Sequence, residues 1–262
     1  MAVKVEIGIV CTPGPESGRP GVNKDNYLLC RDGKARFRKG ENATIREAGD
    51  QGILLAVSDG LGNGRDGEIA ATAAVQSLPL LLDATWPPGA TPEEHLRLYL
   101  LSSHHRIRDA AKAAGPVRMG AALTVAWLLG SQVHWAHIGD TRLYHLRYRQ
   151  LHQITRDHSL VARMVEQNRL SPEEARNHPH ANILLRTVGT ERDVDIDIFT
   201  VELEKGDRLL LCSDGLWGEI EDQDIEAILN HYADPRVVCR EMVRAALHGG
   251  GRDNVTTVLV EI

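Results

Sequence analysis

The sequence predicts an α+β fold, in which helices pack on sheets built from strands that are distant along the chain. Short apolar runs bounded by turn signals occur throughout, as is typical of buried strands. Segments with helical features, including residues 91–114 and 234–248, separate groups of these runs, which favours helices layered on sheets. No linker-like or low-complexity segment divides the chain, so we expect one domain over residues 1–262.

The first half of the chain is expected to contain strands and two helices. A glycine-rich turn precedes a helix from about Asp66 to Leu78, which Pro79 should end or kink. Thr91 begins a second helix, because a capping hydroxyl, a proline in the first turn and Glu94 form a strong helix start. Strands are expected near residues 3–11, 26–31 and 53–58, with a polar hairpin or loop over 31–51.

The second half is expected to begin with strands and to continue into a charged helical excursion over residues 156–177. Ser171 caps a helix inside this excursion, and Asp234 with Pro235 opens a last long helix that reaches about His248. Strands are expected at 121–129, 133–138, 142–147, 196–202, 208–212 and 255–260.

Composition restricts the class of function. The chain has 30 basic and 36 acidic residues, a net charge of −6, and its basic residues are scattered, so we expect no nucleic-acid partner. Its longest apolar stretches are about ten residues, too short to cross a bilayer. The N-terminus lacks the long apolar region of a signal peptide, and the 4 cysteines show no CxxC spacing. We therefore expect a cytoplasmic protein with reduced thiols.

Several aspartates stand at the ends of apolar runs. Two stretches are near copies of each other, and they end at Asp59 and Asp214, each followed by glycine. Asp140 also ends an apolar run, and Asp253 lies just before the last expected strand. Burying an ionisable carboxylate is costly unless a cation meets it. Carboxylates without thiolates or imidazoles indicate a hard divalent cation such as Mg²⁺ or Mn²⁺.

The segment 59–68 has four glycines in ten residues directly before a helix. Glycine-rich loops often only permit a tight chain reversal, and this structural explanation stays open. A glycine after a ligand aspartate also lets a backbone carbonyl, here that of Gly60, approach the same ion.

Seven short motifs follow one another between residues 23 and 254. They are Asn23-Lys24-Asp25, Asp59-Gly60-Leu61-Gly62-Asn63-Gly64 with Gly67-Glu68, Met119-Gly120-Ala121-Ala122-Leu123-Thr124, His137-Ile138-Gly139-Asp140-Thr141-Arg142, Thr155-Arg156-Asp157-His158-Ser159, Cys212-Ser213-Asp214-Gly215-Leu216-Trp217 and Gly250-Gly251-Arg252-Asp253-Asn254. In this order and spacing they resemble the metal-dependent serine/threonine protein phosphatases of the 2C type (PPM family), in the bacterial branch. A single motif is weak evidence for the family, but seven motifs in the family's order and spacing are specific evidence for it.

The resemblance implies a four-layer α-β-β-α sandwich of two antiparallel sheets flanked by helix pairs, with a helical flap near residues 156–190. It also implies hydrolysis of phosphoserine and phosphothreonine on proteins by a metal-activated water. The implied cofactors are two Mn²⁺ or Mg²⁺ ions, with a third, weaker ion. The implied partners are phosphorylated proteins, a bacterial Ser/Thr kinase and its targets.

Carried over by position, the resemblance assigns the metal ligands. Asp59 bridges two ions, the carbonyl of Gly60 binds one of them, and Asp214 and Asp253 bind the other. Asp140 holds the third ion together with Asp214. Asp59, Asp214 and Asp253 are therefore the expected catalytic residues.

Asp25 is assigned to orienting metal-bound water, and the sequence around it departs from the family pattern. The phosphate-binding arginine normally lies five residues earlier, where this chain has Pro20, so Arg19 becomes the candidate phosphate contact. Lys24 stands where an acidic or amide residue is common. On a regular strand it faces away from the ions, whereas a bulge would turn it toward them. Leu61 stands where eukaryotic members carry a histidine proposed as general acid.

Three alternatives remain. Any of His158, His178 and His180 in or beside the flap is a candidate general acid, whereas His137 is expected to be a core histidine with satisfied ring nitrogens. A pseudophosphatase that binds phosphoproteins without turnover has Lys24 in its favour, but a binding module needs no complete set of metal ligands. An enzyme of the same fold that acts in partner switching is the third.

We expect a monomer without a membrane partner.

Overall fold

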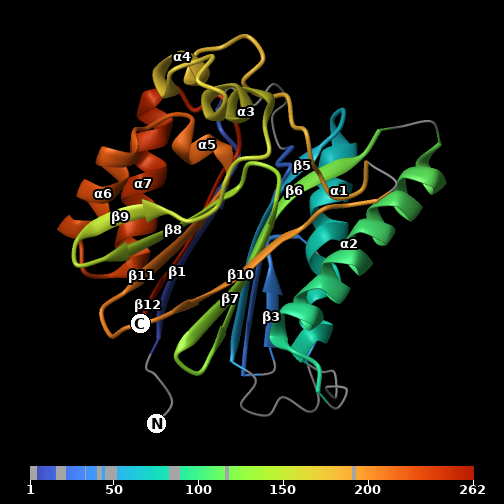
Figure 1. The fold of residues 1–262 in the computed structure, drawn as a ribbon, viewed down its shortest axis with the longest axis horizontal. Coiled ribbons are helices and arrows are strands. Elements are labelled where there is room, and N and C mark those ends of the chain that lie inside the picture. Colours follow the sequence, from blue (N-terminus) through green and yellow to red (C-terminus); the bar gives the residue numbers. More distant parts are fainter. Residues whose placement is uncertain are drawn as a thin grey trace.

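The computed structural model describes residues 5–15, 22–32, 34–39, 43–44, 52–82, 89–115, 118–190 and 193–262. Its strands form two antiparallel sheets that face each other, with helices on the outer side of each sheet (Figure 1). The expected α+β sandwich is therefore confirmed.

The larger sheet has the strand order β10-β7-β6-β5-β2-β3-β4, and all neighbouring strands are antiparallel. Part of the polar segment 31–51 forms its outer strands, in agreement with the expected hairpin; residues 45–51 lie outside the described part. The strands are β2 (Asp25–Arg31), β3 (Lys34–Phe37), β4 (Ala43–Thr44), β5 (Ile53–Leu61), β6 (Gly120–Leu129), β7 (Gln132–Ile138) and β10 (Asp197–Glu202).

The smaller sheet has the strand order β1-β12-β11-β8-β9, again antiparallel throughout. Its central strand β11 pairs with both β12 and β8, so that the segments before Asp214 and after Asp253 lie side by side. The strands are β1 (Glu6–Thr12), β8 (Arg142–Arg147), β9 (Gln150–Gln153), β11 (Arg208–Cys212) and β12 (Val255–Glu261).

Strand alternation divides the core into layers. On β5, Leu55 and Val57 pack between the sheets, whereas Leu54 packs under the helices of the larger sheet. On β11, Leu211 packs between the sheets and Leu210 under the other helices. This period of two is what a strand buried on both faces requires, because successive side chains point to opposite sides.

Helices cover the outer faces of both sheets. The larger sheet carries α1 (Arg65–Gln76), the 3₁₀ helix η1 (Leu78–Leu82) and α2 (Pro92–Ala114), and the smaller sheet carries α5 (Asp214–Trp217), α6 (Asp222–His231) and α7 (Pro235–Gly249). The helix predicted to end at Leu78 ends at Gln76, and Pro79 lies inside η1. Thr91 and Glu94 form the expected capping box.

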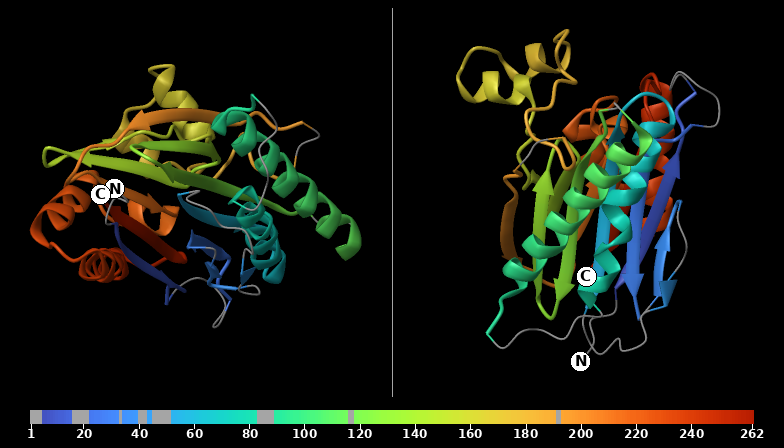
Figure 2. Two further views of the ribbon diagram at one scale, coloured as in Figure 1. Left: turned by 90° about the horizontal axis from the view of Figure 1, so that it is seen from below. Right: turned by 90° about the vertical axis from the view of Figure 1, so that its right-hand side faces the viewer.

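The excursion between β9 and β10 contains the two short helices α3 (Leu160–Glu166) and α4 (Pro172–Arg176). Figure 2 shows these helices projecting beyond the end of the sandwich, where the predicted flap was expected. We call residues 156–190 the flap.

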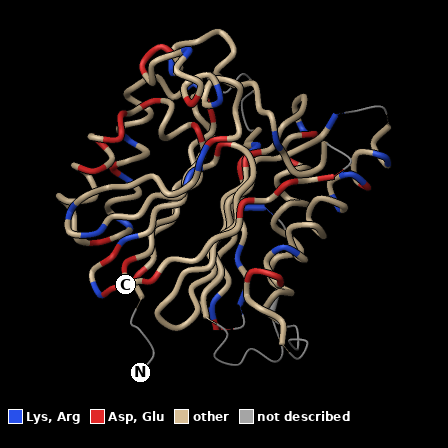
Figure 3. Tube along the Cα trace, viewed as in Figure 1, with Lys and Arg blue, Asp and Glu red and all other residues tan. Residues whose placement is uncertain are grey.

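Lys and Arg positions are distributed over both sheets and their helices (Figure 3). Of the helices in the described ranges, none combines the length and the apolar character that a bilayer crossing requires.

Candidate active site

The aspartates singled out in the sequence come together at one end of the sandwich. Asp25 opens β2 and pairs directly with Asp59, near the end of β5. Asp214 opens α5 just after β11, Asp253 lies just before β12, and Asp140 follows β7. Strand ends from both sheets thus bring carboxylates that are far apart in the sequence to one place.

Burial and mutual repulsion disfavour the ionised form of Asp59 and of Asp214. Burial raises the pKa of Asp59 well above its usual value, and the charges of Asp25, Asp140 and Asp253 raise it further. Burial likewise raises the pKa of Asp214, together with the charges of Asp59 and Asp253. A nearby divalent cation would reverse this preference, because it stabilises the ionised form.

Asp25 is buried and hydrogen-bonded by two hydroxyl groups. Ser213 Oγ and Thr256 Oγ1 each donate to its Oδ2 at 2.7 Å. Burial raises the pKa of Asp25 to about 8, the two hydroxyl hydrogen bonds lower it, and the charges of Asp214 and Asp253 raise it. Ser213 and Thr256 also exchange backbone and side-chain hydrogen bonds, which join the start of α5 to β12.

The oxygen donors fit a hard cation. Buried Oδ1 atoms of Asp140 and Asp214 have no hydrogen-bond partner in the part of the chain that the structure describes. A buried carboxylate oxygen without a donor is costly, and a cation would satisfy it. Across the described ranges, however, no group of three or more His, Cys, Asp or Glu side chains closes around one point. The carboxylates are gathered without forming a closed cage.

Two glycines permit a close backbone approach at this end of β5. A Cβ at Gly60 would collide with the carbonyl of Gly67 in the first turn of α1. Conversely, a Cβ at Gly67 would lie 2.5 Å from the carbonyl oxygen of Gly60. The glycine-rich segment therefore serves more than chain reversal, because it places the Gly60 carbonyl against the start of α1.

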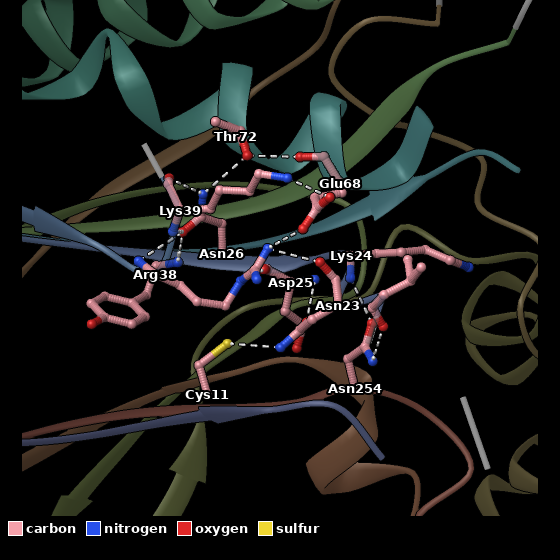
Figure 4. Close-up of polar contacts among 12 residues, drawn as sticks. Cys11, Asn23, Lys24, Asp25, Asn26, Arg38, Lys39, Glu68, Thr72 and Asn254 are labelled. Atoms are coloured by element: carbon pink, nitrogen blue, oxygen red, sulfur yellow. Dashed lines mark hydrogen bonds and ion pairs between the residues drawn. The ribbon is translucent and has the colours of Figure 1, made fainter. Parts of the chain in front are cut away.

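A polar network supports the segment that carries Asp25, as Figure 4 shows. Arg38 Nε donates to the Asp25 carbonyl at 2.7 Å, and Arg38 Nη2 donates to the Asn23 carbonyl at 2.8 Å. Arg38 Nη2 also pairs with Glu68 Oε1 at 3.1 Å, and Glu68 binds Lys39. The end of β3 and the start of α1 thus brace the segment before β2.

Asp140 is supported through its backbone. The indole Nε1 of Trp217 donates to the Asp140 carbonyl at 3.0 Å, and the Arg142 guanidinium lies 3.7 Å from the centre of the Trp217 ring. Arg142 also forms a bidentate pair with Asp157, at 3.0 Å from Nε to Oδ1 and 2.7 Å from Nη2 to Oδ2. Burial raises the pKa of Asp140, and the charge of Asp214 adds to this effect.

The flap is attached on both sides of this centre. At its base, the N–H of Gly139 donates to His158 Nδ1 at 3.2 Å, and His158 N–H donates back to the Gly139 carbonyl at 2.7 Å. In α4, Arg176 donates to the carbonyl of Trp217 at 2.8 Å. The flap therefore touches both the residue before Asp140 and the helix that begins with Asp214.

The candidate histidines differ in their surroundings. His137 is buried, and its nitrogens contact Thr124 Oγ1 and the Arg156 carbonyl, which confirms the expectation of a satisfied core histidine. His158 is also engaged at both nitrogens, since Nε2 lies 3.2 Å from Asp197 Oδ2. Among the three candidates for a general acid, His158 is thus the one whose ring is fixed by contacts to Gly139 and Asp197.

Several supporting residues have no role in the sequence-based assignment. Four of them stand inside the recognised motifs, although the motifs alone do not tell what the side chains bind: Asn23, Arg142, Ser213 and Trp217. Thr256 lies outside them and gives no sequence signal beyond its place in a strand. Arg19 lies outside the described residues, so its predicted phosphate contact stays a prediction.

Known proteins share this architecture. The model of the family "Protein phosphatase 2C" matches residues 41–248. The serine/threonine phosphatase stp of Listeria monocytogenes is 34% identical over 240 residues, covering 87% of this chain and 92% of the relative. The structure of the Mycobacterium tuberculosis serine/threonine phosphatase PstP/Ppp superposes with a TM-score of 0.81 at 29% identity, covering 98% of each chain.

A structure of the catalytic domain of PstP in complex with two manganese ions is also similar, with a TM-score of 0.77 at 28% identity over 98% of this chain and 99% of that one. The fold and the buried carboxylates thus define a phosphatase of the metal-dependent class. The chain belongs to the protein phosphatase 2C family, and it is a protein serine/threonine phosphatase of the bacterial type.

We predict that Gly67→Ala weakens Mn²⁺ binding about tenfold or more, as displaced supporting groups at metal sites do. The new Cβ would lie 2.5 Å from the Gly60 oxygen and 2.7 Å from Lys24 Cδ, so the carbonyl must move. Isothermal titration calorimetry measures the affinity. The control Gly130→Ala, at a turn with φ of 61° and open space around it, should lose about 1 kcal/mol of stability and keep Mn²⁺ affinity. Unchanged Mn²⁺ binding by Gly67→Ala would contradict the assignment of the Gly60 carbonyl as a metal ligand.

Proposed function

We propose that this phosphatase hydrolyses phosphoserine and phosphothreonine on proteins with the help of two bound Mn²⁺ or Mg²⁺ ions. The observation that carries the proposal is the gathering of the buried Asp140 with the half-buried Asp59 and Asp214 at one end of the sandwich, where desolvation raises the pKa of each. When bound, such ions activate a water for in-line attack and neutralise the phosphoryl oxygens.

The residues that would hold the ions come from both sheets. Asp59, from the larger sheet, would serve both ions, and the Gly60 carbonyl would serve one of them. Asp214 and Asp253, which flank the β11–β12 pair, would serve the other. Asp140 with Asp214 would hold a third ion, because each has a buried oxygen without a hydrogen-bond partner in the described ranges. Water completes the coordination, as Mg²⁺ usually requires.

Asp25 would orient a water rather than bind an ion. Its Oδ2 is held by two hydroxyl groups, which leaves Oδ1 as the atom that we assign to this task. The Arg38 brace keeps its backbone in place. Arg19 remains the proposed phosphate contact from the segment before β2.

The proposed setting is a cytoplasmic monomer that opposes a bacterial Ser/Thr kinase by acting on the phosphoproteins which that kinase produces. The phosphatase relatives and the two-manganese neighbour support phosphoprotein substrates and metal dependence. The full set of carboxylates supports turnover over binding alone, since a binding module would not need to bury mutually repelling charges.

We predict that Mn²⁺ or Mg²⁺ supports turnover of p-nitrophenyl phosphate and of phosphothreonine peptides, and that EDTA abolishes it. The all-oxygen donor set is the physical reason. Release of p-nitrophenol and of inorganic phosphate measures the activity, and excess Mn²⁺ added after EDTA should restore it. Full activity in metal-free buffer with chelator would contradict the proposal, and binding of phosphopeptide without any turnover would favour the pseudophosphatase.

We also predict that Asp59→Asn and Asp140→Ala have different effects. Asp59→Asn replaces the proposed shared carboxylate with a neutral amide and should lower turnover about a thousandfold or more, on the scale of a lost essential catalytic group. Asp140→Ala should lower turnover while two ions remain bound, which calorimetric Mn²⁺ titration can count. Loss of all Mn²⁺ binding in Asp140→Ala would contradict its assignment to a third ion.

A further inference from the structure

Lys24 is held between the segments that carry two of the carboxylates. Its N–H donates to Asn254 Oδ1 at 2.7 Å, and its carbonyl accepts a hydrogen bond from Gly60 N–H at 3.1 Å. Asn254 directly follows Asp253, and Gly60 directly follows Asp59. The backbone of Lys24 is thus positioned by the same two chain segments that position the candidate metal ligands.

The side chain of Lys24 lies along the edge of the site. Its stem packs on Gly67, where a Cβ would meet Lys24 Cδ at 2.7 Å and Cγ at 3.0 Å. The same position lies 2.5 Å from the Gly60 oxygen, so the stem passes beside this carbonyl. Figure 4 shows the side chain extending away from Arg38 and Glu68, outside the network that braces Asp25.

The ammonium of Lys24 acts on the carboxylates without being paired to one. Its charge lowers the pKa of both Asp59 and Asp214, against the effect of burial, so it lies in the field of both groups. Among the described residues, however, Lys24 Nζ has no ion pair within 4.0 Å and no hydrogen-bond acceptor. Lys24 is half-buried as a residue, and within the described part of the chain its ammonium donors are unused, so they are available to an incoming anion.

We propose that Lys24 is a substrate-binding residue whose ammonium binds a phosphoryl oxygen of the phosphate monoester; this inference rests on the proposed function. A phosphate dianion that approaches these carboxylates is repelled by them. The ammonium of Lys24 reduces that repulsion and offers three donors on a flexible stem, which suits phosphate as a point charge.

The test compares Lys24→Met, which keeps the stem and removes the charge, with Lys24→Arg and with the control Lys112→Met. Lys112 is an exposed lysine of α2 that pairs with Asp109, so its loss changes net charge equally. Lys24→Met should raise KM for both p-nitrophenyl phosphate and a phosphothreonine peptide about tenfold, the scale of one lost hydrogen bond to a charged group. It should raise the Ki of inorganic phosphate similarly. Lys24→Arg, which keeps the positive charge, should lose less affinity than Lys24→Met, and Lys112→Met should stay near wild type.

A Mn²⁺ titration without substrate separates phosphate binding from damage to the metal site. Lys24→Met should bind Mn²⁺ at least as tightly as wild type, because a cation has been removed from the field of Asp59 and Asp214. Weaker Mn²⁺ binding by Lys24→Met would overturn the inference. A KM change confined to the peptide substrate would also overturn it, because Lys24 would then contact the polypeptide part of the substrate and not its phosphate.

Unchanged KM and Ki in Lys24→Met, with an active and EDTA-sensitive wild type, would overturn the role of Lys24 and leave the proposed function intact. If the wild type hydrolysed neither substrate with Mn²⁺, the proposed function would fall instead. Calorimetric titration of inorganic phosphate into the Mn²⁺-loaded wild type and Lys24→Met would still decide the role of Lys24.

Discussion

Mutual repulsion among buried carboxylates is the constraint on which the rest of this site depends. Asp25, Asp59 and Asp214 each experience the charge of at least one other member, and burial adds to the cost of ionising them. Such a group is not expected in a sandwich whose only task is to fold, since apolar residues would pack there at lower cost. Stability is given up at this end for a centre that a divalent cation completes.

The surrounding structure makes this burial tolerable by giving the carboxylates directed partners. Ser213 and Thr256 donate to Asp25, and the same hydroxyl of Ser213 accepts the N–H of Thr256, so one hydrogen-bond chain joins both sheets. Arg38 holds the backbone of Asp25, and Trp217 holds that of Asp140. These supports come from different elements and hold the start of β2 and the segment after β7, two parts of the site that are distant in the sequence.

The sequence predicts the fold class and the carboxylates because strong local signals carry both. Apolar runs that end at Asp59 and Asp214 indicate buried strands with ionisable ends, and the capping box at Thr91 marks its helix directly. The supports are not predictable in this way. Whether Thr256 reaches Asp25 depends on how the smaller sheet packs on the larger one, and the direction of Lys24 depends on its contact with Gly67 in α1. Such long-range placements leave no local pattern.

The sensitivity of stability to Mn²⁺ tests this account most directly. The free energy of unfolding of wild type and Asp59→Asn would be measured by urea denaturation, in EDTA and in Mn²⁺. In EDTA, Asp59→Asn should be the more stable protein by about 1 kcal/mol, because an amide does not carry the cost of placing an ionisable group among the other carboxyls. Mn²⁺ at about a hundred times its Kd should stabilise wild type by about 2.7 kcal/mol and reverse the order. The claim that these carboxylates repel one another until a divalent cation binds would be contradicted if wild type were more stable than Asp59→Asn in EDTA and gained no stability from Mn²⁺.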